Sequence, residues 1–327
     1  MKPSDLVSPV LIGFVLAVTA VPAARAQDYP ARQVTFLLPF APGGAIDVAA
    51  RTIAQKMTER LGKPFVVENR PGAGTVTASA AVAKAAPDGY TLLVAPSPLA
   101  TNATLHKKLP YDTANDLTAV ARVADIPFVL VVHPSVPVRT VPELINYVKE
   151  RPGQLSYASS GAGTTLHLAG ELLKSMTGIE MAHIPYRGSP PALNDVVAGH
   201  VQLMFADPSS AMAQMREGKV RALAVSSLSR MPQAPDIPSL AEAGVPGFEA
   251  VSWQLFVAPA GTPKEIVNKL NAELKAVMAL PETQKQIVSL GMIPYVSPDA
   301  DGLRDFIRTE IARWGKVVHQ AGLAGSE

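Results

Sequence analysis

The stretch VTFLLPFAPGGAIDVAAR, residues 34–51, decides the fold of this chain. Its apolar start, residues 34–38, predicts a buried strand that ends at Pro39. A Pro-Gly-Gly turn follows, and apolar residues then recur at helical spacing at Ile46, Ala49, Ile53, Met57 and Leu61. A strand that leads through a glycine turn into an amphipathic helix is a building unit of α/β folds.

The turn at residues 42–44 is a candidate anion-binding site. The first amides of a helix have no partner inside the helix and carry partial positive charge. Glycine has no Cβ, so a ligand can come close to these amides. Asp47 lies in the first turn of the helix, where a carboxylate either caps the amides or contacts a ligand. A plain connecting turn is the alternative interpretation.

The remainder of the chain alternates strand-like and helical runs. This pattern predicts an α/β fold with mostly parallel sheets flanked by helices. The length allows two lobes, which we expect at 27–129 plus 254–327 and at 130–253, joined by crossover strands at 127–133 and 251–259. The other expected strands are 65–68, 90–95, 155–158, 201–205 and 220–226.

A second glycine loop, SSGAGTT at residues 159–165, separates strand 155–158 from a helix. A helix cap needs one hydroxyl, and this loop offers four, so a ligand site competes with simple capping by Thr164 or Thr165. Ligands of open α/β sheets bind at the carboxyl ends of strands. Ser97 and Asn102 follow one predicted strand at such an end, and Asp207 follows another. Each is a candidate ligand contact or an ordinary turn former.

Composition and motifs exclude several classes of function. The formal net charge is +2 and the basic residues are scattered, which does not fit a nucleic-acid-binding surface. The chain has no cysteine, and it lacks the glycine motifs of dinucleotide and P-loop sites. It also lacks the serine motifs of hydrolases and β-lactamases, and its histidines lack the spacing of zinc ligands. We therefore expect no catalytic residue, no cofactor and no metal.

The first 26 residues read as an export signal. Lys2 precedes an apolar segment at 10–21, and Ala24-Arg25-Ala26 fits the small-x-small rule for cleavage. The apolar segment is too short to span a membrane comfortably. We expect cleavage after Ala26 and a periplasmic protein, monomeric in solution.

Long segments of the chain resemble the tripartite tricarboxylate transporter substrate-receptor family, the Bug or TctC-like extracytoplasmic solute receptors. The resemblance extends over nearly all of the chain after residue 26. Its most specific segments are PFAPGGAIDVAAR (39–51), VVENRPGAG (66–74), VVHPSVPVRTVPELI (131–145), PGQLSYASSGAGTTLHLAGELL (152–173), HIPYRGSPPALNDVVAGHVQLMF (183–205) and PSLAEAGVPGFEAVSW (238–253).

The resemblance implies a two-lobed, type II-like periplasmic binding protein that closes on a small organic acid. Such receptors deliver the ligand to membrane transporter subunits or present it to a sensor ectodomain. In the family, the Pro-Gly-Gly turn and the Ser-Ser-Gly loop hold the ligand carboxylate, partly through water. By position, the predicted ligand-binding residues are Phe40, Ala41, Gly43, Gly44, Asp47, Ser97, Asn102, Ser159, Ser160, Gly161, Thr164, Thr165, Tyr186, Arg187 and Asp207.

The sequence departs from the family pattern at two places. Thr75 and Val76 stand where the family continues its GAG turn with glycine and asparagine. Ala206 follows the strand at 201–205 where the family has an acidic residue, and Asp207 comes one position later.

Two alternatives stay open from the sequence. Arg187 either pairs with an acidic ligand through its guanidinium group or is an exposed structural residue. An exported hydrolase is the remaining alternative, although no catalytic constellation supports it.

Overall fold

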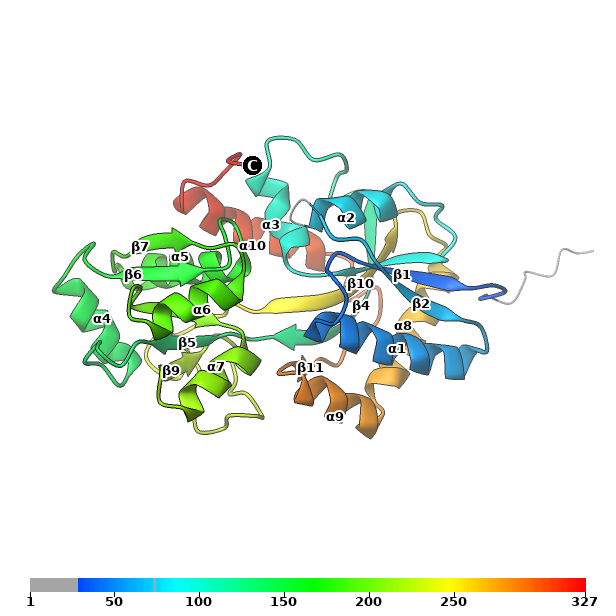
Figure 1. The fold of residues 1–327 in the computed structure, drawn as a ribbon. Coiled ribbons are helices and arrows are strands. Elements are labelled where there is room, and N and C mark those ends of the chain that lie inside the picture. Colours follow the sequence, from blue (N-terminus) through cyan, green and yellow to red (C-terminus); the bar gives the residue numbers. More distant parts are fainter. Residues whose placement is uncertain (1–28, 73–74) are drawn as a thin grey trace, which may run out of the picture.

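A computed structural model describes residues 29–72 and 75–327, so the predicted signal peptide at 1–26 lies outside the described residues. The chain forms two sheets, each with helices on both faces (Figure 1). The first, six-stranded sheet has the order β11-β4-β10-β3-β1-β2. Its strands are β1 (Val34–Leu38), β2 (Phe65–Asn69), β3 (Thr91–Ala95), β4 (Leu117–Ile126), β10 (Ser252–Pro259) and β11 (Ile293–Pro294).

The second, five-stranded sheet has the order β7-β6-β8-β5-β9. Its strands are β5 (Val129–Val132), β6 (Ser156–Ser159), β7 (Ala182–Pro185), β8 (Leu203–Ala206) and β9 (Arg221–Val225). The helices that cover this sheet are α4 (Val141–Lys149), α5 (Thr165–Thr177), α6 (Ser189–Val197) and α7 (Pro208–Arg216). This sheet with its helices is the second lobe.

The first lobe consists of the six-stranded sheet and the helices packed on it. One face is covered by α1 (Ala45–Leu61), α8 (Lys264–Met278) and α9 (Pro281–Ser289). The other face is covered by α2 (Val76–Ala83), α3 (Pro98–Leu105) and the start of α10 (Phe306–Gln320). In the apolar stripe predicted for α1, Ala49, Ile53 and Met57 are buried, and Ile46 and Leu61 are half-buried against the same core. The helix ends at Gly62 in a left-handed conformation.

The two-lobed α/β fold with flanking helices is confirmed, and in each sheet a group of parallel strands is joined by an antiparallel strand from the opposite lobe. In the first sheet β1 is parallel to β2 and β3, whereas β10 is antiparallel to β3 and β4. In the second sheet β6 is parallel to β7 and β8, whereas β5 is antiparallel to β8 and β9. These two strands are antiparallel because β5 and β10 arrive from the opposite lobe. Each therefore enters its sheet from the side at which the carboxyl ends of the parallel strands lie.

Both connections between the lobes are joined by one buried serine. Ser226 follows β9, and its amide donates to the Phe128 carbonyl at 2.8 Å, while its hydroxyl accepts from the Phe128 amide at 2.8 Å. The same hydroxyl donates to the Ala250 carbonyl at 2.6 Å. Phe128 lies on the outgoing connection and Ala250 on the returning one, so Ser226 holds the two connections side by side.

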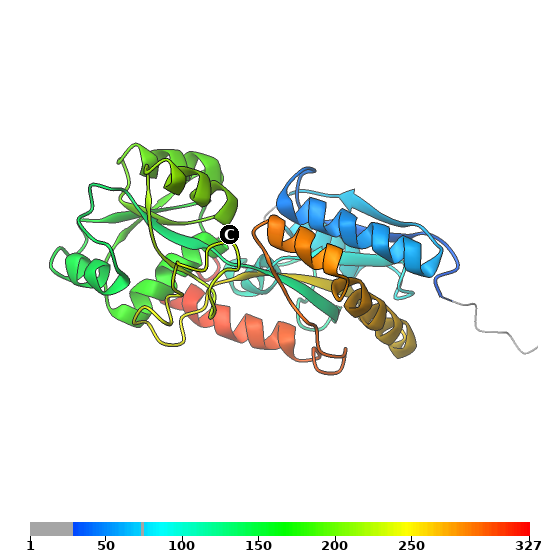
Figure 2. The same ribbon diagram turned by 90° about the horizontal axis from the view of Figure 1, so that it is seen from below.

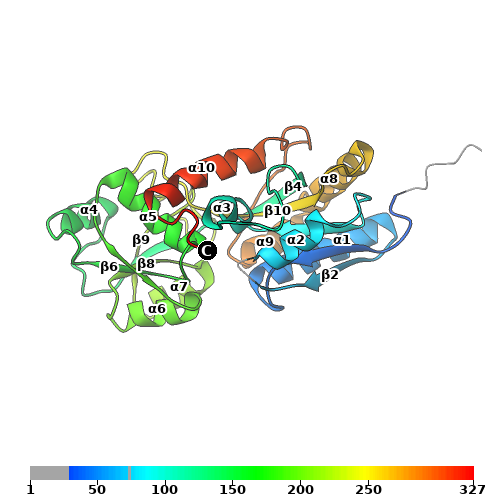
Figure 3. The ribbon, with the colours of Figure 1, turned by 90° about the horizontal axis from the view of Figure 1, so that it is seen from above.

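Helix α10 lies along both lobes, as two further views show (Figures 2 and 3). Its second half buries Trp314 in the core of the second lobe, although its first half packs on the first sheet. The Glu310 carboxylate accepts hydrogen bonds from the indoles of Trp253 at 2.8 Å and Trp314 at 3.2 Å. Because Trp253 lies on β10, this carboxylate ties α10 to the returning crossover strand.

Candidate functional site

A cavity of about 420 Å³ lies between the two lobes. This volume is within the range of about 300–1,000 Å³ that is usual for small-molecule sites. The first lobe contributes Phe40, residues 44–47, Ile126, Leu290 and Met292. The second lobe contributes Ser189, Pro190 and residues 207–210, which are the first turns of α6 and α7. Four predicted site residues therefore line one cavity: Phe40, Gly44, Asp47 and Asp207.

The Pro-Gly-Gly turn leads directly into α1, whose first turn faces this cavity. Gly43 has a φ of +92°, a conformation that favours glycine, and Gly44 is the N-cap residue with φ −74° and ψ 164°. No side chain caps the helix there, and Ala41 to Ala45 are exposed. Because Ala45 and Ile46 line the cavity, the positive end of the α1 dipole faces it.

Asp47 shapes the turn from inside. Its carboxylate accepts hydrogen bonds from the Gly43 amide at 3.0 Å, from Arg51 Nε at 3.0 Å and from Asn69 Nδ2 at 2.9 Å. Burial alone would raise the pKa of Asp47, but these three hydrogen bonds and the charge of Arg51 lower it. The carboxylate is therefore ionised, and both of its oxygens already have partners, which favours a role in holding the turn over a ligand contact.

The second-lobe wall contains a polar group that sequence reasoning missed. Ser189 is the first residue of α6, and its hydroxyl oxygen is buried with no hydrogen-bond partner among the described residues. Neither α6 nor α7 has a side-chain cap at its start. Asp207 is the N-cap residue of α7, half-buried, and its carboxylate has no ion-pair or hydrogen-bond partner within the described part of the chain. The sequence Ser-Pro-Pro predicted the start of a helix but gave no indication that Ser189 lies at a cavity wall.

The Ser-Ser-Gly loop is not among the residues that line the cavity. The Ser159 hydroxyl lies 2.7 Å from His183 Nε2 and accepts from the Gly161 amide at 3.1 Å. Thr164 caps α5, because its hydroxyl accepts from the His167 amide at 3.4 Å. The loop runs beside the entry to α6, where the Gly188 amide donates to the Ser160 carbonyl at 3.2 Å. It therefore lies next to the cavity wall, with several of its amides already partnered.

The other predicted site residues lie at two further places. Ser97 and Thr165 meet across the lobes, and Asn102 is buried beside Thr75, to whose hydroxyl its amide donates at 3.3 Å. Tyr186 donates its hydroxyl to Asp195 at 2.6 Å. Burial, and then the hydrogen bond to Asp195 and its charge, raise the pKa of Tyr186 to about 12. Arg187 is exposed.

The turn between α9 and β11 closes one side of the cavity, and sequence reasoning missed it as well. Leu290 and Met292 line the cavity. A Cβ built on Gly291 would lie 3.3 Å from Pro208 Cβ, so this turn touches the first residue of α7 in the opposite lobe. Gln233, from the loop after β9, donates its side-chain amide to the Val288 carbonyl at 2.5 Å and the Met292 carbonyl at 3.3 Å.

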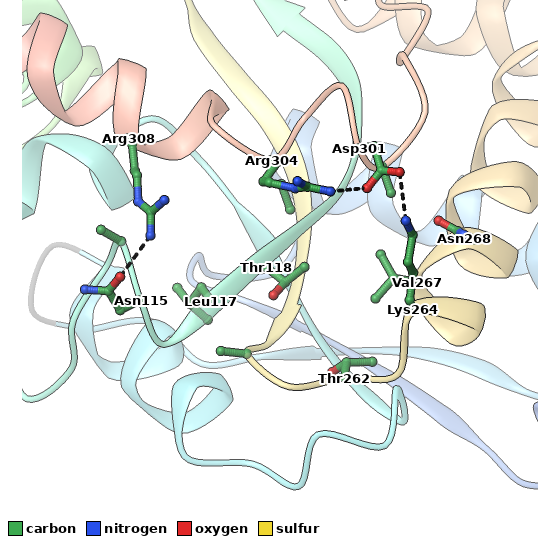
Figure 4. A pocket seen from close by; sticks show the side chains of 14 residues that line it. Asn115, Leu117, Thr118, Thr262, Lys264, Val267, Asn268, Asp301, Arg304 and Arg308 are labelled. Carbon is green, nitrogen blue, oxygen red and sulfur yellow. Dashed lines mark hydrogen bonds and ion pairs between the residues drawn. The ribbon is translucent and has the colours of Figure 1, made fainter.

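A second hollow of about 370 Å³ lies on the first lobe alone (Figure 4). Three cationic side chains line it, but each has a partner. Lys264 and Arg304 both pair with Asp301, at 2.9 and 2.6 Å, and Arg308 donates to Asn115 at 3.0 Å. These side chains are exposed and their partners belong to the same lobe, so the hollow is not shared between the two lobes.

Two kinds of feature are absent from the described residues. No group of three or more histidine, aspartate or glutamate side chains in them could hold a metal ion. None of the helices in this part of the chain combines the length and the apolar character needed to cross a membrane. A peptide-lined cavity between two lobes is thus the candidate site.

Comparison with known proteins gives consistent matches over nearly the whole chain. A UPF0065 protein of a Pseudomonas species, encoded in the tcbD-tcbE intergenic region, is 40% identical over 312 residues, which are 94% of this chain and 93% of the relative. The R. palustris protein Rpa4515, solved with adipate, is 39% identical with a TM-score of 0.77, covering 91% of this chain and 99% of its own.

The solved periplasmic binding protein BugD is 35% identical with a TM-score of 0.74, and the match covers 90% of this chain and 99% of BugD. The family described as "Tripartite tricarboxylate transporter family receptor" matches residues 49–323. The chain therefore belongs to the receptor family of the tripartite tricarboxylate transporters.

Proposed function

We propose that this receptor captures a small carboxylate-bearing molecule between its lobes and delivers it to a tripartite tricarboxylate-type membrane transporter. The observation that carries the proposal is the uncapped first turn of α1, which faces a cavity built by both lobes. A carboxylate placed there accepts hydrogen bonds from the amides of Ala45 and Ile46 and interacts favourably with the helix dipole. The adipate complex of the R. palustris relative supports a carboxylate as ligand.

Binding between two lobes couples ligand capture to closure. The ligand contacts α1 from the first lobe and α6 and α7 from the second, so the closed arrangement gains more from the ligand than an open one. Ser226 joins both connections, so we place the hinge where they pass between the lobes, at residues 126–129 and 250–252. The lobes would then comprise 27–129 with 254–327, and 130–253.

Binding rather than catalysis fits the cavity. Among the described residues that line it, the hydroxyls of Ser189, Ser209 and Ser210 have no histidine beside them to act as a base. For location, the export signal read from residues 1–26 and the similarity to a periplasmic binding protein both support a periplasmic receptor.

A ligand screen tests the proposal. The chain from Gln27 onward is tested by thermal shift against mono-, di- and tricarboxylates, with their amides and alcohols as uncharged analogues. A ligand that binds the native state alone raises the melting temperature. We expect acids but not their uncharged analogues to stabilise the protein, with calorimetric confirmation and no turnover of the ligand. Stabilisation by neither class, or hydrolysis of candidate esters, would overturn the proposal.

A further inference from the structure

The two walls of the cavity differ in the hydrogen-bonding groups that they present. We propose that this difference between the walls selects an acid with a single carboxylate, an apolar body and a hydrogen-bond-donating group at its far end. This inference rests on the proposed function. The carboxylate binds at α1, and the far group, a hydroxyl, amide or ammonium, faces Asp207 and Ser189. A second carboxylate at that end is disfavoured.

The first-lobe wall is the anion-binding end. The residues that begin α1, Ala45 and Ile46, keep their N–H groups, and no side chain caps them. The Asp47 carboxylate leaves these two amides available, because its hydrogen bonds come from Gly43, Arg51 and Asn69. This wall therefore offers donors and partial positive charge.

The second-lobe wall has the opposite character. Helix α6 begins Ser189-Pro190-Pro191, so two of its first-turn residues have no N–H to donate. Helix α7 begins with Pro208 and is preceded by Asp207, whose carboxylate has no charged partner among the described residues. The starts of α6 and α7 thus have fewer backbone N–H groups for an anion than an ordinary helix start, and the start of α7 also carries a carboxylate.

An independent observation points to a ligand group at this wall. Ser189 lines the cavity, and its hydroxyl oxygen is buried and has no partner in the part of the chain that the structure describes. Leaving a buried polar group without a partner is unfavourable, so a ligand group that pairs with it gains affinity. A hydroxyl accepts as well as donates, so a donor on the ligand can bind Ser189 and Asp207 together.

The space between the walls is apolar. Phe40, Ile46, Ile126, Leu290 and Met292 line it, and the described lining residues include no lysine, arginine or histidine. A hydrocarbon or aromatic body gains from this burial. A second carboxylate would lose water there and meet Asp207 without a counter-ion.

Matched acids test the inference by calorimetry on the chain from Gln27 onward. One set is 6-hydroxyhexanoate, 6-aminohexanoate, hexanoate and adipate, and the other is 4-hydroxybenzoate, benzoate and terephthalate. We expect a hydroxy or amino acid to bind at least about tenfold more tightly than the dicarboxylate with the same body, because like charges placed together are strongly disfavoured. Asp207→Asn should shrink this ratio severalfold, and the exposed Asp236→Asn should leave it unchanged.

The outcomes separate this inference from the proposed function. If a dicarboxylate binds most tightly and Asp207→Asn leaves the ratio unchanged, the inference is wrong while the receptor function stands. The same conclusion follows if neither set binds but another organic acid does. If no organic acid of the wider screen binds, the proposed function itself fails.

Discussion

The hydroxyl of Ser97, two residues after β3 ends, lies 3.0 Å from the hydroxyl of Thr165, the first residue of α5. The two residues belong to opposite lobes and are both buried. Ser97 also donates to the hydroxyl of Ser252, at the start of β10, at 3.0 Å. These three hydroxyls set the spacing of the lobes at the place where the returning strand enters the first sheet.

Removing the Thr165 hydroxyl should loosen this contact. Thr165→Val keeps the shape of the side chain but loses the bond to Ser97, so we expect about 1 kcal/mol less free energy of unfolding and a severalfold weaker affinity for the acid ligand. Urea unfolding and calorimetry measure the two effects. Thr177→Val is the control, because its hydroxyl bonds only within α5, to the Leu173 carbonyl. Equal losses of affinity in both variants would contradict the role of Thr165 between the lobes.

Gly163→Ala should be more destabilising than a matched change elsewhere. Gly163 and Gly178 both have a φ of +69°, so alanine is strained at either position, at a cost of about 1–3 kcal/mol. A Cβ at Gly163 would also lie 2.3 Å from Leu105 Cδ2 in α3, whereas a Cβ at Gly178 has no atom within 4 Å. We expect Gly163→Ala to lose an additional 1–3 kcal/mol, roughly, in urea unfolding. Similar losses in the two variants would show that the loop does not pack against α3.

The stability of the second lobe should depend on pH through two stacked histidines. The rings of His167 and His183 lie 3.6 Å apart at 6°, and Tyr157, Glu171 and Lys174 surround them. Burial lowers the pKa of His183 to about 4, and burial with the neighbouring His183 lowers the pKa of His167 to about 4. His167 Nδ1 accepts a hydrogen bond from the Gly163 amide at 3.0 Å, which requires the neutral ring.

The direction of the pH effect follows from these lowered values. Between the ordinary pKa of 6.5 and about 4, the unfolded chain binds protons that the native histidines do not. The free energy of unfolding is therefore highest above pH 6.5 and falls as the pH drops toward 4, by up to about 1.4 kcal/mol per pH unit for each histidine. Urea unfolding between pH 7.5 and 4.5 should show His183→Phe reducing this slope and the exposed His319→Phe leaving it. A slope unaffected by His183→Phe would refute the assignment.

The sequence predicted the parts of the site that are local in the chain. The first strand, glycine turn and helix are encoded by spacing within residues 34–61, and the structure places them as expected. Strand β4 was missed, because its charged Arg122 and Asp125 obscure the apolar pattern. In the structure these two side chains pair with each other, with Nε and Oδ1 at 2.7 Å.

The remaining wall of the cavity depends on contacts far apart in the chain. Ser189, Pro208 and Met292 come together only because the chain crosses between the lobes and α9 packs beside α1. The spacing of residues within one segment cannot predict such contacts between distant segments. The Ser-Ser-Gly loop was predicted from local sequence, but its hydroxyls have partners within the chain. Ser159 accepts from an amide of the loop, and Thr164 accepts from an amide of the first turn of α5. Contact of these two residues with ligand stays a prediction.

The most direct test of the central claim is the affinity of Gly44→Asp for the tightest acid found in the screen. Gly44 has the extended N-cap backbone that aspartate favours, and a Cβ there has no atom within 4 Å, so the melting temperature should be unchanged or slightly higher. The introduced carboxylate occupies the amides that the ligand would use, and affinity should fall at least about 100-fold, while Gly44→Ala retains it. Affinity within about threefold of the parent in a folded Gly44→Asp protein would contradict carboxylate capture at α1.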